Sequence, residues 1–350
     1  MLLLIPDLLA PAEFLRAALP DLALPGLGRL LAFAPVVTEE PPGADFQRST
    51  PASRWLFAQA GVPVPMSDDA PWALAFAALD GIAAEPAARA LAVLSPCHFA
   101  LARDHVVLSG LAGHGSVALP VIDDWRRMTS QVAGLAGPAT AIDCSNNRRW
   151  HASGDWLAQL RTADPLRALG RNVDRWLPVD TDASADRSVA GPARDWRRLH
   201  NEIQMSWFAE AGEDANVNAV WLHGVAATGI VPARPPFKAL AGNDGDDRWR
   251  AFAAWTATPW VAATSLASAG DADVAVLDAL TLPLVAGEVG AWREALEQLD
   301  RDWFAPLSER REGSAHRIVA CSENGWRGFD CRRSSWRFWD RCPLASQLLA

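Results

Sequence analysis

The sequence predicts an α/β protein with a mainly parallel sheet and an inserted α+β domain. Short apolar runs alternate with amphipathic helical patterns at both ends of the chain, as in parallel-sheet proteins. The middle of the chain has short apolar runs separated by turn residues, which is typical of an α+β domain. Half of the 350 residues are hydrophobic, which is enough for a large core. We expect a core domain from residues 1–60 and 217–350, and an inserted domain from residues 61–216.

The N-terminal part of the core domain is expected to begin with a buried strand, Met1–Ile5. A helix should follow from Pro11 to about Ala18, and a second helix over Leu27–Phe33. Pro and Gly in residues 39–44 indicate a loop, after which Ser53–Ala60 returns to helix.

The inserted domain should contain several short strands and one long helix. The expected strands are Leu91–Leu94, Phe99–Leu101, His105–Leu108, Ala139–Asp143 and Trp150–Ala152. The expected helix is Asp195–Glu210, because large apolar side chains recur in it at helical spacing.

The C-terminal part again alternates strands and helices. The expected elements are a strand at Val217–Leu222, a helix at Trp249–Trp255, a strand at Val274–Leu277, an amphipathic helix at Gly290–Phe304 and a strand at Ile318–Cys321. A tail rich in Arg and Trp follows.

Composition excludes several classes of protein. The net charge of −9 argues against coating nucleic acid or an anionic membrane with the whole surface. Five cysteines without a CxxC pair favour reduced thiols and a cytoplasmic protein. The apolar start carries Pro6 and Asp7 and lacks a basic region, so we interpret it as a strand and not as a signal peptide. No apolar stretch is long enough to cross a membrane.

Three segments, in this order and spacing, carry a family resemblance. They are LLLIPDLLAP with LPGLGRLLAFA, then LHNEIQM (199–205) with NVNAVWLHG (216–224), then VAVLDALTLPLVAGEVGAWREALEQLDRDWFAPL. Together they resemble the archaeal-type cofactor-independent phosphoglycerate mutases and their divergent bacterial relatives, the RpfE-type regulatory proteins. Residues 170–178 (GRNVDRWLP) are similar to the RpfE-type group specifically.

The resemblance implies an alkaline-phosphatase-like core, in which two Mn or Zn ions and a serine transfer a phosphoryl group. Asp7 matches the first metal ligand of the family. Thr281 and Val285 stand where the family has a metal-binding Asp and His, and the late ligand pair falls at residues 321–323, which contain no His. We therefore expect a vestigial Asp7 without an intact two-metal centre.

Candidate ligand-binding residues lie around the second matching segment. Asn201, Glu202 and Gln204 lie on the helix that borders the substrate cleft in the family, although anchoring of the helix is an alternative role. Asn218 and His223 lie on the next strand, whose end should face the cleft. His223 replaces an Arg of the family, and the loop between Trp207 and Asn216 lacks the family's HPVNxxR motif.

The Arg- and Trp-rich tail is a candidate interaction surface. Its key residues are Arg332, Arg333, Trp336, Arg337 and Trp339. Interleaved Arg and aromatic side chains can bind nucleic acid or an acidic protein partner. The alternative is an amphipathic helix that packs its Trp and Phe side chains on the core.

Other polar groups have simpler interpretations. Ser49, Thr50 and Ser53 lie where a nucleophile could fall, but Ser53 is more simply a helix N-cap. Residues 180–186 and 243–247 resemble solvated turns more than cation sites, and His98 is more simply structural.

We expect a degenerate phosphoglycerate-mutase-like protein that is regulatory or binds a small phosphorylated or carboxylated metabolite, with no cofactor. One alternative is an active phosphoglycerate mutase or phosphohydrolase that uses Mn or Zn. Another is an interaction module that uses the tail. The substituted ligands favour a protein without enzymatic activity, and that question stays open at this stage.

Overall fold

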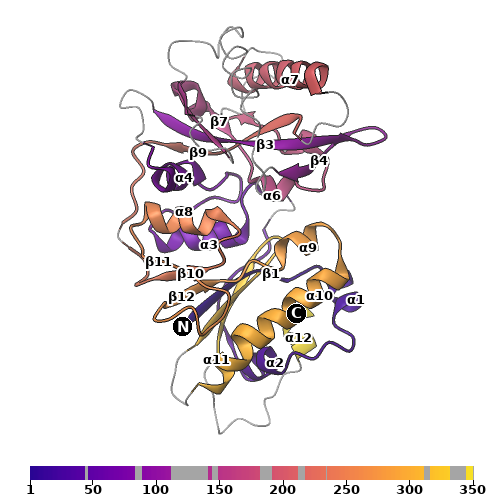
Figure 1. Cartoon of the computed structure of the whole chain (residues 1–350), viewed down its shortest axis with the longest axis vertical. Helices are drawn as coiled ribbons and strands as arrows, with labels where there is room; N and C mark the ends of the chain where they lie inside the picture. Colours follow the sequence, from indigo (N-terminus) through magenta and orange to yellow (C-terminus); the bar gives the residue numbers. More distant parts are fainter. Residues whose placement is uncertain are drawn as a thin grey trace. The chain divides into compact units, whose positions relative to one another are not determined.

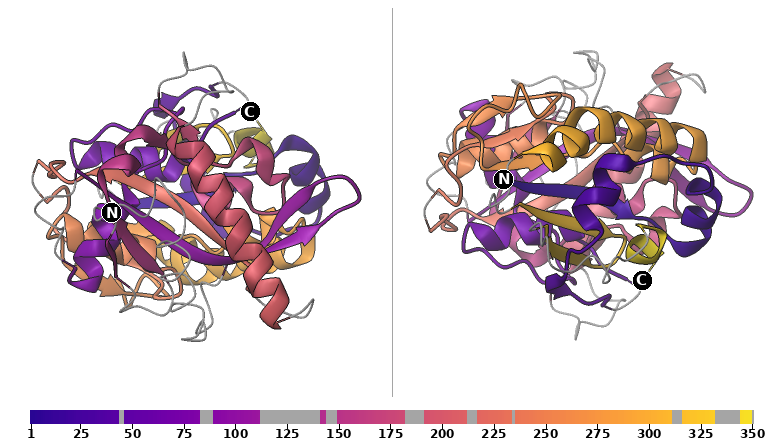
Figure 2. Two further views of the ribbon diagram at one scale, coloured as in Figure 1. Left: turned by 90° about the horizontal axis from the view of Figure 1, so that it is seen from above. Right: turned by 90° about the horizontal axis from the view of Figure 1, so that it is seen from below.

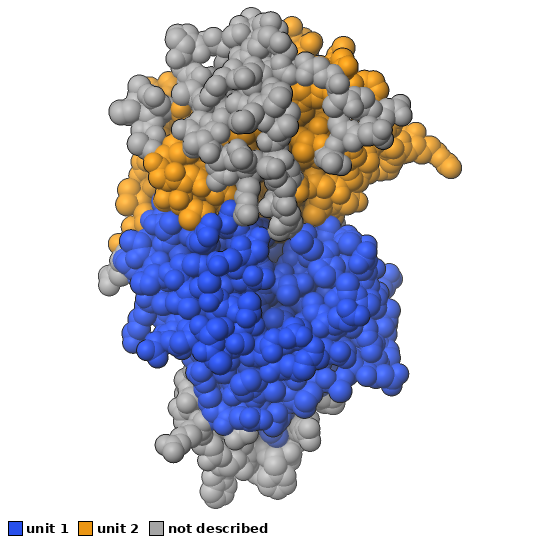
Figure 3. Space-filling model, in the orientation of Figure 1, with its two compact units in different colours: residues 1–46, 50–60, 234–350 blue, residues 47–49, 61–233 orange. Residues whose placement is uncertain are grey.

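The computed structural model describes residues 1–43, 46–82, 89–111, 141–143, 149–181, 191–211, 217–233, 235–310, 316–331 and 344–349. The chain forms two compact units (Figures 1 and 3). Unit 1 comprises Met1–Phe46, Thr50–Ala60 and Arg234–Ala350, and unit 2 comprises Gln47–Ser49 and Gly61–Ala233. The structure is mixed α/β with a large, mostly parallel sheet, which confirms the predicted fold class.

Unit 1 is built on a sheet that we call the large sheet. Its strands are β1 (Leu2–Leu9), β2 (Val36–Glu40), β10 (Leu240–Gly242), β11 (Trp260–Ala262), β12 (Val274–Val276), β13 (Arg317–Ser322) and β14 (Trp326–Asp330). Among the described residues these seven strands lie in the order β11-β10-β12-β1-β13-β14-β2. The first five are mutually parallel, whereas β14 and β2 are antiparallel to their neighbours.

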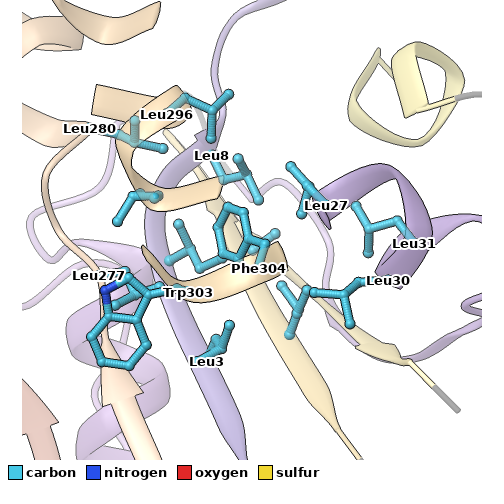
Figure 4. Packing of buried hydrophobic residues seen from close by; sticks show 14 of the residues in the cluster. Leu3, Leu8, Leu27, Leu30, Leu31, Leu277, Leu280, Leu296, Trp303 and Phe304 are labelled. Atoms are coloured by element: carbon cyan, nitrogen blue, oxygen red, sulfur yellow. The ribbon is translucent and has the colours of Figure 1, made fainter. Parts of the chain in front are cut away.

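Helices flank the large sheet. They are α1 (Ala12–Ala18), α2 (Pro25–Leu31), α3 (Pro51–Gln59), α8 (Asp247–Trp255), α9 (Thr281–Val285), α10 (Val289–Leu299), α11 (Ala305–Glu309) and α12 (Leu344–Leu349). Alternate residues of β1, Leu3 and Ile5, pack with α1, α2 and α10 in one apolar core (Figure 4). Figure 2 shows α10 running alongside β1. Helices α3 and α8 pack against each other through Phe57 and Phe252, whose ring centroids lie 5.3 Å apart.

The predicted helix 290–304 changes its hydrogen-bonding pattern near its end. Its last five residues, Asp300–Phe304, form a π-helical turn after α10. The buried Asp300 carboxylate accepts hydrogen bonds from the backbone N–H groups of Gly26 (3.0 Å) and Leu27 (2.7 Å). It thereby satisfies donors at the start of α2 that have no partner within that helix. A Cβ on Gly26 would lie 2.3 Å from the Ala305 nitrogen, so this close approach requires glycine.

Unit 2 contains a second sheet, which we call the small sheet. Its elements are β3 (Ala90–Leu101), β4 (Val106–Leu111), β5 (Ala141–Asp143), β6 (Trp150–Ser153) and β9 (Ala219–Ala227). Among the described residues the order is β4-β3-β6-β5, and β9 also pairs with β3; all of these pairs are antiparallel. The expectation that the strand after residue 217 belongs with the core domain is therefore wrong, because β9 completes this sheet.

Helices cover both faces of the small sheet. Helix α7 (Pro192–Ala211) packs Trp196, Ile203 and Trp207 on one face. Helix α4 (Trp72–Asp80) lies on the other face, where Phe76 contacts His223. The shorter elements of unit 2 are η1 (Asp155–Gln159), β7 (Leu160–Arg161), α6 (Pro165–Ala168), η2 (Val173–Arg175) and β8 (Val179–Asp180). Within the described ranges, no helix has the length and apolar character needed to cross a membrane.

Candidate functional site

Four adjacent strands of the large sheet end in ionisable side chains at the same edge. Strands β10, β12, β1 and β13 are parallel neighbours, so their carboxyl ends meet at one edge. Asp246 follows β10, Asp278 follows β12, Asp7 lies near the end of β1, and Cys321 lies near the end of β13. We call these four residues the acidic edge. Ligands of open α/β sheets gather beyond the carboxyl ends of strands.

Asp7 has an unusual backbone conformation. Its φ of 59° lies in the left-handed region, and the pairing of β1 with β13 shifts register between Ile5 and Leu9. Such a conformation costs about 1–3 kcal/mol for a residue other than glycine, and it is concentrated at functional sites. The side chain of Asp7 is partly exposed. The strained backbone therefore holds a reachable carboxylate at the edge.

Asp278 is the second partly exposed carboxylate. Burial and the charge of Asp246 raise the pKa of Asp278 from 3.8 to about 6. The Trp249 indole N–H, 2.6 Å from the Asp278 carboxylate, acts in the opposite direction. Asp246 itself caps α8 by accepting from the Arg248 backbone N–H at 2.9 Å, and it also accepts from Arg248 Nε at 2.8 Å.

The arginines near the acidic edge already have carboxylate partners. The buried Arg54 donates from Nε to both oxygens of Glu40, at 3.0 and 3.1 Å. Arg248 is paired with Asp246. Glu40 and Asp246 are therefore ion-pair partners of the arginines beside the edge.

The fourth position of the acidic edge is a buried cysteine. Burial, followed by the charge of Asp7, raises the pKa of the Cys321 thiol well above its ordinary value. A metal-binding cysteine must be deprotonated. The hydroxyl of Thr281, a position where the resemblance places a metal-binding Asp, is buried and makes no hydrogen bond. Among the described residues, no three or more His, Cys, Asp or Glu side chains are arranged to hold a metal ion. Thr281 and Val285 therefore do not supply the Asp and His ligands that the resemblance implies at these positions.

The candidate ligand-binding residues of unit 2 do not come together. Asn201 and Glu202 are exposed on α7, and Gln204 is partly exposed there. His223 lies on the opposite face of the small sheet, buried against Phe76 of α4, with Nε2 only 2.8 Å from the Ser95 hydroxyl.

Asn218 has a structural role in the small sheet. Its side-chain oxygen accepts from the Phe99 N–H at 2.7 Å, and its amide donates to the Phe99 carbonyl at 2.8 Å. Both hydrogen-bonding groups of the amide are used to join β9 to β3.

Other sequence candidates also find local partners. Thr50, and not Ser53, is the N-cap of α3, and it accepts from the Ser53 backbone N–H at 3.2 Å. Ser49 is buried, with its hydroxyl 3.4 Å from the Pro65 carbonyl. The loop 243–247 is a turn in which Asn243 accepts from the Gly245 N–H at 3.2 Å. The tail residues, Arg332, Arg333, Trp336, Arg337 and Trp339, lie outside the described residues.

Comparisons with known proteins find distant structural neighbours. No protein-family model matches the chain, and no curated protein matches it in sequence. The chain is similar to the solved structure of a cofactor-independent phosphoglycerate mutase from Thermoplasma acidophilum, with 14% identity, a TM-score of 0.39, and coverage of 99% of this chain and 94% of the other. It is also similar to the PH0037 protein from Pyrococcus horikoshii, with 10% identity, a TM-score of 0.46, and coverage of 94% of this chain and 86% of the other. Similarity at this level does not define a function.

Sequence reasoning missed Asp278 and Asp246. Each follows a short buried strand, and the rule that ligands gather at the carboxyl ends of parallel strands points to both positions. The sequence pattern places Asp246 in a solvated turn, and the family resemblance points to Thr281 and Val285 and not to Asp278.

Proposed function

We propose that the chain binds a small polar molecule at the acidic edge of the large sheet and does not catalyse two-metal phosphoryl transfer there. One observation carries the proposal: four neighbouring parallel strands bring Asp246, Asp278, Asp7 and Cys321 to one edge, where Asp246 pairs with Arg248 and Asp278 accepts from the Trp249 indole.

The chemistry of the edge also suggests how a ligand would be held. Asp7 and Asp278 are partly exposed hydrogen-bond acceptors, so they favour hydroxyl or amino groups on the ligand. A phosphate or carboxylate that approaches Arg54 or Arg248 competes with Glu40 or Asp246, which already pair with them. A hydroxylated metabolite therefore fits the edge better than one that relies on an anionic group.

A calorimetric titration tests the proposal. Purified protein is titrated with 3-phosphoglycerate and with glycerate, which has the same hydroxylated skeleton without the phosphoryl group, each with and without Mn²⁺. We expect binding without metal, and loss of at least tenfold in affinity in Asp7→Asn and Asp278→Asn. Asp271→Asn, which changes an exposed carboxylate before the start of β12 and therefore at the opposite edge of the sheet, is the matched control. Binding of either compound that is unaffected by both edge variants would place the site elsewhere.

The second candidate function is metal-dependent phosphoryl transfer. It is favoured by the three carboxylates, Asp246, Asp278 and Asp7, that reach one edge from adjacent strands. A coupled mutase assay with added Mn²⁺ separates the two functions. Turnover that disappears in Asp7→Ala supports the enzyme, whereas binding without turnover supports the proposed binding protein.

A further inference from the structure

A serine and a histidine in unit 2 have the geometry of a nucleophile and its base. Ser95 on β3 and His223 on β9 lie on the neighbouring strands that pair in the small sheet. The Ser95 hydroxyl is 2.8 Å from His223 Nε2. This distance lies within the range of about 2.6–3.2 Å in which a base can take a hydroxyl proton.

The imidazole is held in position from several sides. Its ring is 97% buried and meets the edge of Phe76, with the centroids 6.5 Å apart. Phe76 is fixed in turn by the Arg149 guanidinium, which lies 4.4 Å from its ring centroid and is paired with Asp80.

The backbone next to His223 is equally constrained. The N–H of Gly224 donates to the buried Asp69 carboxylate at 2.6 Å. Gly224 has a φ of 66°, and a Cβ there would lie 2.9 Å from Trp72 Cβ. Because only glycine fits this close approach between β9 and α4, the position of His223 is set by packing on both sides.

The serine is more accessible than its partner. Ser95 is partly exposed, whereas His223 is buried. On the side of β3 away from β9, pairing with β6 ends at Leu94 and pairing with β4 begins at Cys97. In the part of the chain that the structure describes, no strand pairs with Ser95 or Pro96 on that side.

A second Ser–His pair in the same sheet lacks these features. The Ser109 hydroxyl is 2.6 Å from His98 Nδ1, but it also donates to the His98 carbonyl at 3.1 Å. Its proton therefore already has a backbone acceptor, and the pair is exposed to solvent. The contrast makes Ser109 an internal control for Ser95.

We propose that Ser95 is a nucleophile that cleaves small acyl esters, with His223 as its general base. The Ser95 oxygen attacks the ester carbonyl carbon while its proton moves to His223 Nε2. The bond to the leaving alcohol breaks, and the alcohol oxygen takes that proton from His223. Water, deprotonated by His223, then attacks the acyl-serine, which releases the carboxylic acid and returns the proton to Ser95. Water is the only co-reactant.

The experiment uses the full chain and p-nitrophenyl acetate. We measure release of p-nitrophenol and map the acetylated residue by peptide mass spectrometry, in wild type, Ser95→Ala, His223→Gln and Ser109→Ala. Wild type should be acetylated at Ser95, and Ser95→Ala should lose that label. His223→Gln should be acetylated at least about 100-fold more slowly than wild type, because a general base contributes about 10²–10⁴-fold to the rate. Ser109→Ala should react like wild type.

Two outcomes would overturn the proposal. The first is folded wild-type protein that carries no acetyl group on Ser95. The second is a His223→Gln variant that is acetylated as fast as wild type. If His223→Gln does not fold, the pH dependence of wild type decides, because acetylation must slow at acidic pH when the imidazole is protonated. A rate that stays constant through that range rules out His223 as the base.

Discussion

Replacement of Asp278 by Asn should stabilise unit 1 at neutral pH. The pKa of Asp278 is about 6 in the folded protein, against 3.8 ordinarily, so the folded state favours the neutral carboxyl. Each pKa unit is worth about 1.4 kcal/mol, which makes the penalty for the charged form on the order of 3 kcal/mol. Partial exposure reduces this figure, and the amide is a weaker acceptor for the Trp249 indole. We expect a net stabilisation of about 1–2 kcal/mol.

The pH dependence of this effect has a definite sign. Because the folded pKa is raised, the penalty is fully present above about pH 6 and disappears as the pH falls towards 3.8. Urea unfolding followed by Trp fluorescence at several pH values should therefore show the gain of Asp278→Asn at pH 7.5 and not at pH 4.

A matched variant isolates the electrostatic cause. The exposed Asp244 also accepts from an indole N–H, that of Trp260 at 3.0 Å, so Asp244→Asn makes the same chemical change without burial. It should alter stability by no more than about 0.5 kcal/mol. A destabilised Asp278→Asn at pH 7.5, or a gain of equal size in Asp244→Asn, would refute the reasoning.

Three further predictions concern stability. Gly26→Ala should destabilise unit 1 by about 1–3 kcal/mol or more in urea unfolding, because the Cβ meets the Ala305 backbone. Gly28→Ala in the same helix meets nothing within 4 Å and should stabilise by about 0.5–1 kcal/mol, and equal effects of the two would contradict the packing. Asp300→Ala should cost about 1–3 kcal/mol by leaving the buried N–H groups of α2 without an acceptor, and an unchanged urea midpoint would count against that role. Burial lowers the pKa of His200 to about 4, so the free energy of unfolding of unit 2 should fall by up to about 3 kcal/mol between pH 6.5 and pH 4. His200→Gln should reduce this dependence of stability on pH. If the variant shows the same pH dependence as wild type, His200 is not its cause.

Much of the fold follows from local sequence patterns. The opening strand, the long helix of unit 2 and the buried strand near residue 274 were predicted because apolar periodicity is a local signal. The pairing of β9 with β3 was not predicted, because it depends on residues more than 100 positions away in the sequence. The role of Asp300 was not predicted either, because its carboxylate accepts hydrogen bonds from residues 273 and 274 positions earlier in the chain.

The candidate site was predictable only in part. Asp7 was a candidate only because the family resemblance places the first metal ligand there. Prediction of Asp278 needs two facts that the sequence does not show. One is that β12 lies beside β1, and the other is that the charge of Asp246, at the start of α8, acts on Asp278. The proximity of Ser95 to His223 likewise depends on strand register, which the residues alone do not fix.

The most direct test of the central claim is the metal content of the acidic edge. The protein is equilibrated with Mn²⁺, separated from free metal by gel filtration and analysed by plasma mass spectrometry, in parallel with Asp7→Ala. The proposed binding function predicts no tightly bound metal at the edge, and therefore the same metal content in both proteins. Two tightly held ions per chain in wild type that are lost in Asp7→Ala would contradict it.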